Sequence, residues 1–360
     1  MWHKTKASQS LGIKYPIIQG PFGGKFSSPR LLAAVSNAGG MGSFGLNAYT
    51  PEEILEIDRE IKTLTRNPYA LNLWVPWVKD PVENFRQEEY ENLKKLFQPY
   101  FDKLQVPLPE MPEMTKNPDF ERQMEAVFNA RPPVMSFIFG IPPKEVILEL
   151  KKAGIPSIAT ATTLEEAQLI EEAGMDLVIA SGAEAGGHRA SFLKPAEDSL
   201  HPTFSLLTQV AEKVKIPVIA AGGISDGKRA FEALQLGASA VQIGTAFLAT
   251  DESNASQEHK NRLQSKEPFQ TALTKVFTGR LARAMANTLS HDFENCEKGL
   301  APYPLQSTFL APLRKAAIEK QQWDLVAFWS GQPSSVLTHR SAEQLFEALV
   351  HEITLAMGEK

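Results

Sequence analysis

The stretch SGAEAGGHRASF, from Ser181 to Phe192, places a proton-active side chain among small residues. Glycine weakens both helices and strands, so this composition is typical of a loop whose backbone lies close to a bound group. Histidine has an unperturbed pKa of about 6.5, close to neutral pH, so it can move a proton or hydrogen-bond an anion. We therefore interpret His188 as the candidate catalytic residue of this loop.

Two other motifs, AAGGIS and QIGTAF, place glycines directly after apolar runs. Gly222 and Gly223 follow the first run, and Gly244 and Thr245 close the second. Without Cβ atoms, backbone N–H groups can approach an anion closely, and Thr245 adds a hydroxyl group. Glycines also end strands for structural reasons, so it is the two motifs together that indicate a phosphate site.

Four further side chains each have a functional and a structural interpretation. Tyr303 in APYPLQ could hydrogen-bond a substrate or simply pack in its loop. Glu184 could orient His188 or cap a turn. Arg280 and Arg283 in TGRLAR could neutralise an anion or brace the C-terminal part of the chain.

The elements that would position these residues follow a repeated pattern of apolar strand, polar turn and amphipathic helix, clearest over 153–182 and 214–245. Unbroken apolar strands are covered on both faces, which favours parallel pairing through helical crossovers. The strand candidates are Tyr15–Gln19, Gly42–Phe44, Ala70–Val75, Val134–Phe139, Ser157–Thr160, Leu177–Ala180, Pro217–Ala221 and Ala240–Ile243. Eight such units predict an α/β fold, a closed (β/α)8 TIM barrel, with an open doubly wound sheet as the alternative.

Barrel active sites lie at the carboxyl ends of the strands, where all three glycine motifs would meet. We expect residues 1–250 to form the barrel, with helices at Pro29–Ala38 and Pro51–Leu64 and an N-cap at Thr50. An insertion over 76–133, after the third strand, is interpreted as a lid or as an oligomer contact. Residues 251–360 are expected to form a helical C-terminal extension that packs on the barrel and covers the active site.

Composition restricts the class of protein. The chain is 43% hydrophobic and 22% charged, with a net charge of −5 and scattered basic residues, which does not favour nucleic acid as a partner. The one cysteine, Cys296, fits a reducing compartment and is interpreted as a bystander. The N-terminus lacks a signal-like apolar run and no segment approaches the ~18 apolar residues of a membrane span, so we expect a cytoplasmic protein without a membrane partner. No metal site is predicted, because no metal-ligand spacing occurs among His201, His259 and His291.

Several motifs in order along the chain carry a resemblance to a known family. They are PIIQGPF, LAAVSNAGGMGSFG, GAEAGGHR, IPVIAAGGISDG and AVQIGTAFL, followed by TGRLARAMAN, APYPLQ and FWSGQ. Together they resemble the nitronate monooxygenases, formerly called 2-nitropropane dioxygenases, which are FMN-dependent TIM barrels. The likeness spans most of Tyr15–Leu248 and continues into the C-terminal part.

The resemblance implies an FMN site. Its implied cofactor contacts are Gly20, Pro21 and Phe22 along the flavin ring, Asn72 as a hydrogen-bond partner of the ring, Ser181, Gly186 and Gly187 beside it, and Gly222, Gly223, Gln242, Gly244 and Thr245 at the ribityl phosphate end. His188 would take the α-proton of a nitroalkane or bind the anionic nitronate, with Tyr303 as a further substrate contact. Three positions depart from the family pattern: Ser181 stands where glutamine is common, Phe22 where methionine is common, and Ala190 where glycine is common.

The implied activity is oxidation of alkyl nitronates by O2 to carbonyl compounds and nitrite, without NAD(P)H and with neutral nitroalkanes left open as substrates. The alternative is an NAD(P)H-dependent flavin reductase of the same superfamily, either a FabK-like enoyl-acyl-carrier-protein reductase or an NADH:quinone reductase. A flavin-binding regulatory protein is a third class, for which we would expect the histidine to be lost. A homodimer is left open.

Overall fold

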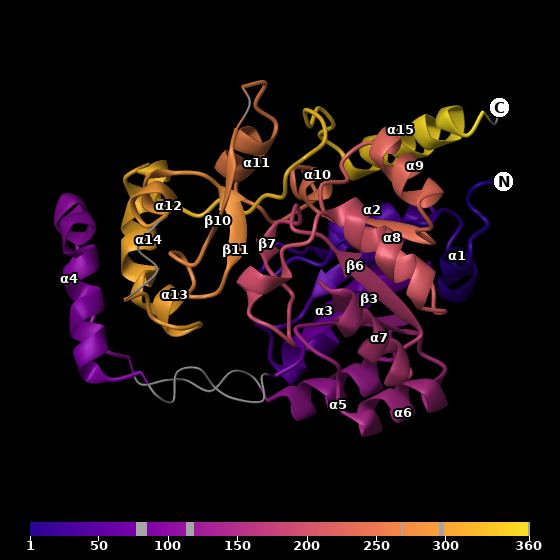
Figure 1. Ribbon diagram of the computed structural model, residues 1–360, viewed down its shortest axis with the longest axis horizontal. Coiled ribbons are helices and arrows are strands. Elements are labelled where there is room, and N and C mark those ends of the chain that lie inside the picture. The colour runs from indigo at the N-terminus through magenta and orange to yellow at the C-terminus, as the bar shows by residue number, and fades with distance from the viewer. Residues whose placement is uncertain (77–84, 113–118, 268, 295–298, 359–360) are drawn as a thin grey trace.

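The structure is a computed structural model that describes residues 1–76, 85–112, 119–267, 269–294 and 299–358 (Figure 1). Cys296 lies outside the described residues. Within them, eight parallel strands form one sheet in the order β1-β9-β8-β6-β5-β4-β3-β2. These strands are β1 (Ile17–Gln19), β2 (Gly42–Gly45), β3 (Tyr69–Trp74), β4 (Val134–Ile138), β5 (Ser157–Ala161), β6 (Leu177–Ser181), β8 (Val218–Ala221) and β9 (Ala240–Ile243).

A bridge between Ile18 and Met41 joins the two edges of this sheet and closes the barrel. The Gln19 N–H donates to the Met41 carbonyl at 2.9 Å, and the Met41 N–H donates to the Ile17 carbonyl at 3.0 Å. The predicted TIM barrel is therefore confirmed. All eight strands lie within two residues of their predicted bounds, because most of them are apolar runs that helices cover on the outside.

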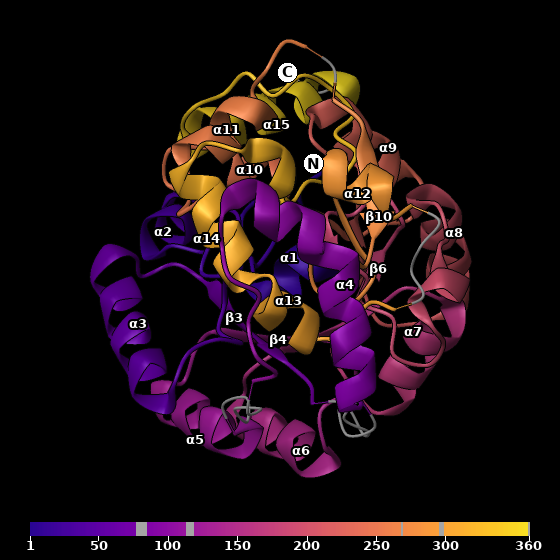
Figure 2. The same ribbon diagram turned by 90° about the vertical axis from the view of Figure 1, so that its left-hand side faces the viewer.

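Helices surround the barrel (Figure 2). They are α2 (Pro29–Asn37), α3 (Pro51–Leu64), α5 (Phe120–Ala130), α6 (Lys144–Ala153), α7 (Leu164–Glu172), α8 (Thr203–Lys213), α9 (Gly227–Gln235) and the one-turn α10 (Thr245–Leu248). The predicted N-cap of α3 is present as a capping box: Thr50 Oγ1 accepts from the Glu53 N–H, and the Glu53 carboxylate accepts from the Thr50 N–H.

The last helix of the chain, α15 (Ala342–Ala356), packs against both α2 and α9 and so completes the ring of helices. It thus belongs to the barrel although it falls in the segment predicted as an extension. The two chain ends meet here, where Trp2 Nε1 donates to Thr354 Oγ1 at 3.0 Å. The predicted insertion likewise includes a barrel helix, since α5 packs against α3.

Two apolar cores hold the barrel together. The inner core fills the amino-terminal end of the barrel, where Ala7 and Leu11 of α1 (Lys6–Leu11) pack with inward strand residues such as Ile158, Ile179 and Ile219. The larger core lies between the strands and the surrounding helices and continues into the C-terminal part. Because α1 plugs one end, only the opposite, carboxyl end of the barrel is left for a site.

A second lobe stands in front of the end of the barrel that lies opposite α1 (Figures 1 and 2). It combines α4 (Gln87–Leu104) of the insertion with α12 (Thr288–Asp292), α13 (Leu305–Phe309) and α14 (Ala311–Glu319) of the C-terminal part. Aromatic side chains join the two segments: the rings of Phe97 and Phe293 stack with centroids 4.7 Å apart, and Tyr100 donates to Asp292 at 2.6 Å. Helix α4 of the insertion therefore packs on the C-terminal part of the chain.

A small antiparallel sheet links this C-terminal part to the barrel. It has the order β10-β11-β7 and consists of β10 (Thr271–Thr274), β11 (Ala282–Met285) and the two-residue β7 (Gly187–His188). The segment predicted as a helical extension thus also contributes strands, along with α11 (Gln257–Leu263) and short 3-10 turns at Ala196–Ser199 and Trp323–Leu325. The loop after β6, predicted to be irregular, is held as a strand at His188.

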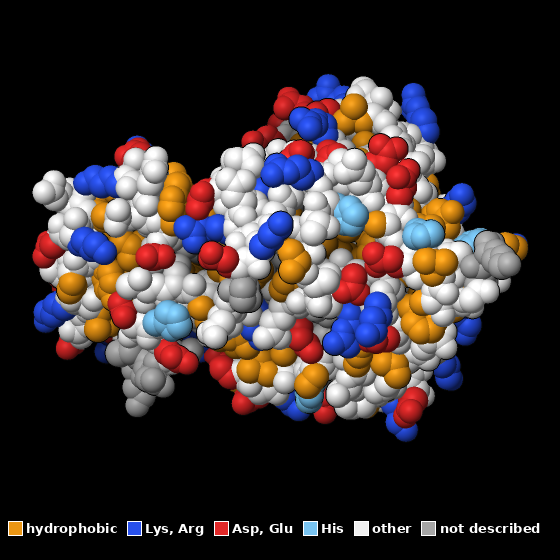
Figure 3. All heavy atoms as spheres, turned by 90° about the horizontal axis from the view of Figure 1, so that it is seen from above, with side chains coloured by type: hydrophobic (Ala, Val, Ile, Leu, Met, Phe, Trp, Pro, Cys, Tyr) orange, Lys and Arg blue, Asp and Glu red, His pale blue; other side chains and the backbone are white. Residues whose placement is uncertain are grey.

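Charges are mixed on the face shown in Figure 3, where Lys and Arg side chains alternate with Asp and Glu and form no large patch of one sign. No helix in the described ranges is both long and apolar enough to cross a membrane.

The packing of α15 predicts that it is required for global stability. Phe346 on this helix is buried against Tyr15 and Gly40, so Phe346→Ala should lower the free energy of unfolding by about 3–5 kcal/mol. Urea unfolding followed by circular dichroism measures this, with the exposed Glu347→Ala on the same helix as a control that changes stability by less than about 0.5 kcal/mol. Equal stabilities of the two variants would show that α15 is a dispensable appendage.

Candidate active site

His188 is positioned by pairing between distant parts of the chain. On β7 it lies opposite Ala282 of β11, and the next N–H, that of Arg189, donates to the Leu281 carbonyl at 2.9 Å. The strand follows β6 directly, so His188 stands at the carboxyl end of the barrel, where its motif predicts it. A segment almost a hundred positions later in the chain therefore fixes the backbone of the candidate catalytic residue.

Four aromatic rings surround the imidazole. Trp74, at the end of β3, lies edge-on with its centroid 5.8 Å away, and Phe139, just after β4, lies at 6.3 Å. Tyr303 and Trp329 come from the C-terminal part, with centroids at 5.5 and 5.8 Å. The predicted substrate contact Tyr303 is thus beside His188, whereas sequence reasoning missed the other three rings.

Gly279 explains how the Tyr303 segment comes so close. Its φ is +83°, and a Cβ atom there would lie 2.2 Å from the Ala301 carbonyl oxygen. Any other residue would be strained in this conformation and would push the 301–303 segment away. The glycine of the TGRLAR motif therefore brings Tyr303 to His188.

Burial, together with the smaller effect of the nearby Arg280 guanidinium, lowers the pKa of His188 to about 3. Part of His188 is accessible to solvent. Its imidazole ring, however, lies deep among the aromatic side chains, and this burial of the ring is what lowers the pKa. Its Nε2 is 2.9 Å from Thr278 Oγ1. At neutral pH the imidazole is therefore uncharged and held by a hydroxyl group.

Three arginines surround the loop after β6. Arg189, almost completely buried, donates to the Ser181, Gly182 and Ser199 carbonyls. Arg280 donates to the Arg189 and Ser191 carbonyls and lies over the Phe139 ring, with Cζ 4.3 Å from its centroid. Arg283 donates to the Ala183 carbonyl at 2.8 Å. Arg280 and Arg283 thus brace the loop through backbone carbonyls, and they also place positive charge around His188.

Two carboxylates complete the frame of the loop. Glu184 accepts from the N–H and hydroxyl of Thr203 at 2.9 and 2.8 Å, so it caps the start of α8. Glu166, fully buried, accepts from the Phe192 and Leu193 N–H groups at 2.6 and 3.1 Å. Of the two interpretations of Glu184, the hydrogen bonds support the capping one.

The barrel brings one group of predicted cofactor residues together where β1 and β9 end. The Gly20 N–H donates to the Ile243 carbonyl at 2.9 Å, and a Cβ on Gly20 would lie 3.5 Å from Gln242 Cγ. Phe22, which follows Pro21, lies next to Gly244. Thr245 Oγ1 accepts from the Gly331 N–H at 2.9 Å, which leaves its own hydrogen available to another acceptor.

The predicted glycines fall into two kinds. A Cβ on Gly186 would lie 2.4 Å from the Gly331 nitrogen, and one on Gly222 would lie 2.7 Å from Thr203 Oγ1, so these two are needed for protein packing. A Cβ on Gly223 would lie 3.1 Å from Glu184 Cβ, which is a tight contact. A Cβ on Gly187 would meet nothing within 4 Å, and the nearest atom at Gly244 is 3.8 Å away. Open space at a glycine is where a bound group can approach the backbone.

The two remaining predicted contacts, Asn72 and Ser181, lie at strand ends. Asn72 is buried and donates through Nδ2 to Ser136 Oγ at 2.9 Å. Ser181 ends β6 and is tied to Arg189 through its carbonyl at 3.0 Å. Sequence reasoning missed Thr278, Trp329 and Trp74 as neighbours of His188. Thr278 and Trp329 lie in motifs that carry the family resemblance, and Trp74 follows Asn72 by two positions. Their closeness in sequence to predicted residues is the signal that could have found them.

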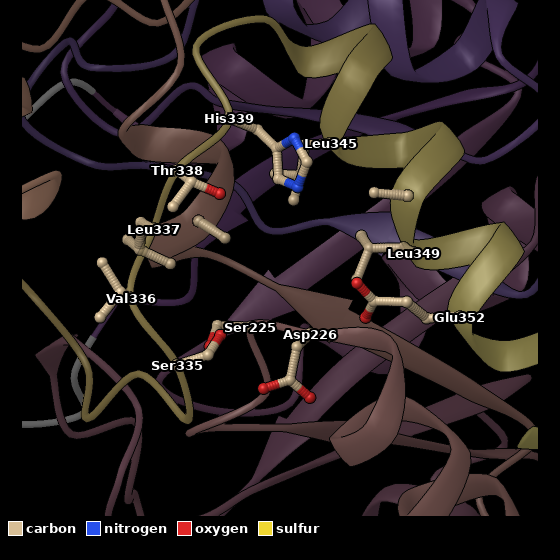
Figure 4. A pocket seen from close by; sticks show the side chains of 12 residues that line it. Ser225, Asp226, Ser335, Val336, Leu337, Thr338, His339, Leu345, Leu349 and Glu352 are labelled. Atoms are coloured by element: carbon tan, nitrogen blue, oxygen red, sulfur yellow. The ribbon is translucent and has the colours of Figure 1, made fainter.

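A pocket of about 220 Å³ lies elsewhere, between the start of α9, the 335–339 segment and α15 (Figure 4). Asp226 caps α9 there and Glu352 accepts from the Gly227 N–H at 2.6 Å, so both acids are part of helix packing. In the described part of the chain, no group of three or more His, Cys, Asp or Glu side chains is arranged to hold a metal ion.

Comparison with known proteins identifies the family. The family model for nitronate monooxygenase matches residues 4–352. The chain belongs to the nitronate monooxygenase family. A probable nitronate monooxygenase from Staphylococcus aureus (strain Newman) is 36% identical over 361 positions, covering all of both chains. The likeness seen in the motifs is thus confirmed, and it extends over the insertion and the C-terminal part.

Solved structures agree with this membership. A crystal structure of nitroalkane oxidase from Streptomyces ansochromogenes superposes with a TM-score of 0.88 at 35% identity, covering 98% of this chain and 99% of that one. FabK from Thermotoga maritima is more distant, with a TM-score of 0.73 at 26% identity, covering 99% and 97%. This nitronate monooxygenase family member is therefore an oxidoreductase.

The lowered pKa of His188 predicts a pH dependence of stability. Because the folded-state pKa of about 3 lies below the ordinary value of 6.5, the unfolded chain binds the proton first as the pH falls. The free energy of unfolding should thus decrease from about pH 6.5 toward pH 3. In the His188→Gln variant it should decrease less steeply. His259, with a pKa of about 4, still contributes to the decrease in both proteins. Urea unfolding across this range measures both curves, and parallel curves would rule out a neutral, buried His188.

Proposed function

We propose that this protein is an FMN-dependent enzyme that oxidises alkyl nitronates with O2 to carbonyl compounds and nitrite. The observation that carries the proposal is the environment of His188: a neutral imidazole in an aromatic enclosure, next to the Arg280 guanidinium, in a member of the nitronate monooxygenase family. The substrate is a small molecule that meets this enclosure at the carboxyl end of the barrel.

The charges favour the anionic nitronate over the neutral nitroalkane. Burial lowers the pKa of Arg280 to about 10, so the guanidinium stays charged at neutral pH and attracts an anion. An imidazole whose conjugate acid has a pKa of about 3 is a weak base, because the driving force for proton transfer falls with that pKa. The same neutral ring is well suited to hydrogen-bond a nitronate that arrives already deprotonated.

The residues at the carboxyl end of the barrel fit FMN. Gly187 has open space beside its backbone, a Cβ on Gly244 would make only an ordinary van der Waals contact with Phe22, and Thr245 keeps a hydroxyl hydrogen to donate. Gly20 and Phe22 would lie along the ring, and Gln242 with the loops after β8 and β9 would hold the phosphate end. When bound, FMN supplies the electron acceptor for the nitronate and passes electrons on to O2.

The C-terminal part supplies what the barrel lacks. Tyr303 and Trp329 place apolar ring surface against His188, which excludes water and strengthens the interaction of Arg280 with an anion. We propose that the 251–360 segment, with Trp74 and Phe139, covers the substrate during the reaction.

A second candidate is an NAD(P)H-dependent flavin reductase, favoured by the likeness to FabK from Thermotoga maritima. Such an enzyme would reduce its flavin with a nicotinamide, so the electron donor separates the two functions.

We predict which donor reduces the flavin. The purified holoprotein, mixed without oxygen in separate cuvettes, should lose its visible flavin absorbance with an alkyl nitronate such as propionate 3-nitronate and keep it with NADH or NADPH. Admitting O2 should then restore the absorbance and release nitrite. Rapid bleaching by a nicotinamide would instead support the reductase.

The His188→Asn variant tests the role of the imidazole. If His188 takes the α-proton, turnover of a neutral nitroalkane should fall by ~10²–10⁴-fold, since asparagine cannot accept that proton. Nitronate turnover should fall less, because the amide still donates a hydrogen bond, and the flavin should stay bound. Steady-state O2 consumption with each substrate measures this, and unchanged nitroalkane turnover would eliminate the base role.

A further inference from the structure

The segment 328–332, which carries the FWSGQ motif, crosses the candidate site. Hydrogen bonds tie its two ends to β11 and to the loops after β6 and β9, through the partners Met285, Glu184 and Thr245. Between these ends lies Trp329, whose ring has its centroid 5.8 Å from that of His188 and 6.0 Å from that of Phe277. The position of this segment therefore decides where the Trp329 indole lies in the enclosure.

His259 of α11 holds the middle of the segment. Its Nε2 lies 2.9 Å from the Trp329 carbonyl oxygen. A carbonyl oxygen can only accept a hydrogen bond, so Nε2 carries a hydrogen and donates it. Burial lowers the pKa of His259 to about 4, although this hydrogen bond acts in the opposite direction. The ring is therefore neutral at neutral pH, and Nε2–H is its one N–H group.

The surroundings of His259 strengthen this contact. The side chain is buried, and its ring lies against the rings of Phe26 and Phe328, with centroids 5.8 and 5.3 Å away. In such apolar surroundings a hydrogen bond is stronger than in water, and a polar group that loses its partner is costly. The Trp329 carbonyl is thus held in one direction, together with the backbone that carries the indole.

A neighbouring side chain anchors α11 itself. Lys260 donates to the Asp251 and Ser253 carbonyls at 3.1 and 2.8 Å, which attaches the helix to the chain that follows α10. The hydrogen bond of His259, by contrast, goes to the segment that lies against His188. The two adjacent residues therefore have separable roles.

We propose that His259 is a positioning residue: its Nε2–H fixes the Trp329 carbonyl and thereby the indole that forms one wall of the enclosure around His188. The proposal rests on the function proposed above only in taking this enclosure as the place that receives the nitronate. His259 acts through Trp329 and needs no contact of its own with the substrate.

The variants His259→Gln and His259→Asn test this proposal. Both put a side-chain amide in place of the ring, but the glutamine NH2 group extends as far as Nε2, and the asparagine NH2 group only as far as Nδ1. In holoprotein labelled with fluorotryptophan, fluorine-19 NMR reports the surroundings of each indole, and the Trp329 signal is the one lost in Trp329→Phe. Wild type and His259→Gln should give this signal at one chemical shift, whereas His259→Asn should shift or split it.

The variant Lys260→Met is the matched control on the same helix. It removes the link to the 251–253 carbonyls and keeps the contact with Trp329, so it should lower stability and leave the Trp329 signal unchanged. An unchanged signal in His259→Asn, or an equal change in Lys260→Met, would overturn the proposal. Nitrogen-15 NMR of the wild type would also overturn it by showing His259 Nε2 without a hydrogen, and that measurement depends on no variant.

Kinetics show whether the fixed indole serves the substrate. His259→Asn should raise KM for an alkyl nitronate by about 2- to 10-fold, the effect of one hydrogen bond, and leave kcat nearly unchanged, because the wall contacts the substrate both before and during the reaction. His259→Gln should recover most of the loss. A fall in kcat at unchanged KM would contradict the role given to this wall. Since the fluorine NMR needs no substrate, it decides whether His259 positions Trp329 even if nitronates prove not to be substrates.

Discussion

The pairing of β7 with β11 is the constraint on which the rest of the site depends. Two residues of the loop after β6, Gly187 and His188, form a ladder with Ala282 and Arg283 from the C-terminal part. This short ladder fixes the backbone of His188 and also brings Thr278, Arg280 and Trp329 to its side chain. A barrel without its C-terminal part would therefore keep the glycine loops of a cofactor site and lose the environment that controls the imidazole.

The surroundings of His188 all favour its neutral form. Aromatic rings remove water from around His188, which disfavours its charged form, and Arg280 adds a positive charge nearby. We propose that this neutral ring beside a guanidinium receives an anion. Arg189, Arg280 and Arg283 donate hydrogen bonds to backbone carbonyls. These arginines therefore hold the loop after β6 in place and also supply positive charge.

Much of the fold could be predicted from sequence, because the strands are apolar runs and the glycine motifs end them in a fixed order. The location of His188 and Tyr303 at one end of the barrel follows from the same pattern. The β7–β11 ladder could not be predicted, since a two-residue strand containing glycine has no periodicity. Trp74 and Phe139 read as ordinary apolar residues at strand ends, and Thr278 reads as a turn residue. Their role depends on contacts between distant segments.

Gly186 and Gly222 are predicted as cofactor contacts, but their backbones pack tightly against other parts of the protein. Such packing requires glycine as strictly as a bound ligand does. The roles of the cofactor contacts remain predictions.

The position of α15 has a consequence for how the chain is made. The helix that closes the ring between α2 and α9 follows α9 by about a hundred residues along the chain, so both of its neighbours are synthesised much earlier. Until it arrives, the apolar faces of α2 and α9 that it covers stay exposed on an otherwise assembled barrel. The nascent chain thus exposes this apolar surface while residues 236–341 are synthesised, and exposed apolar surface of this kind is prone to aggregation.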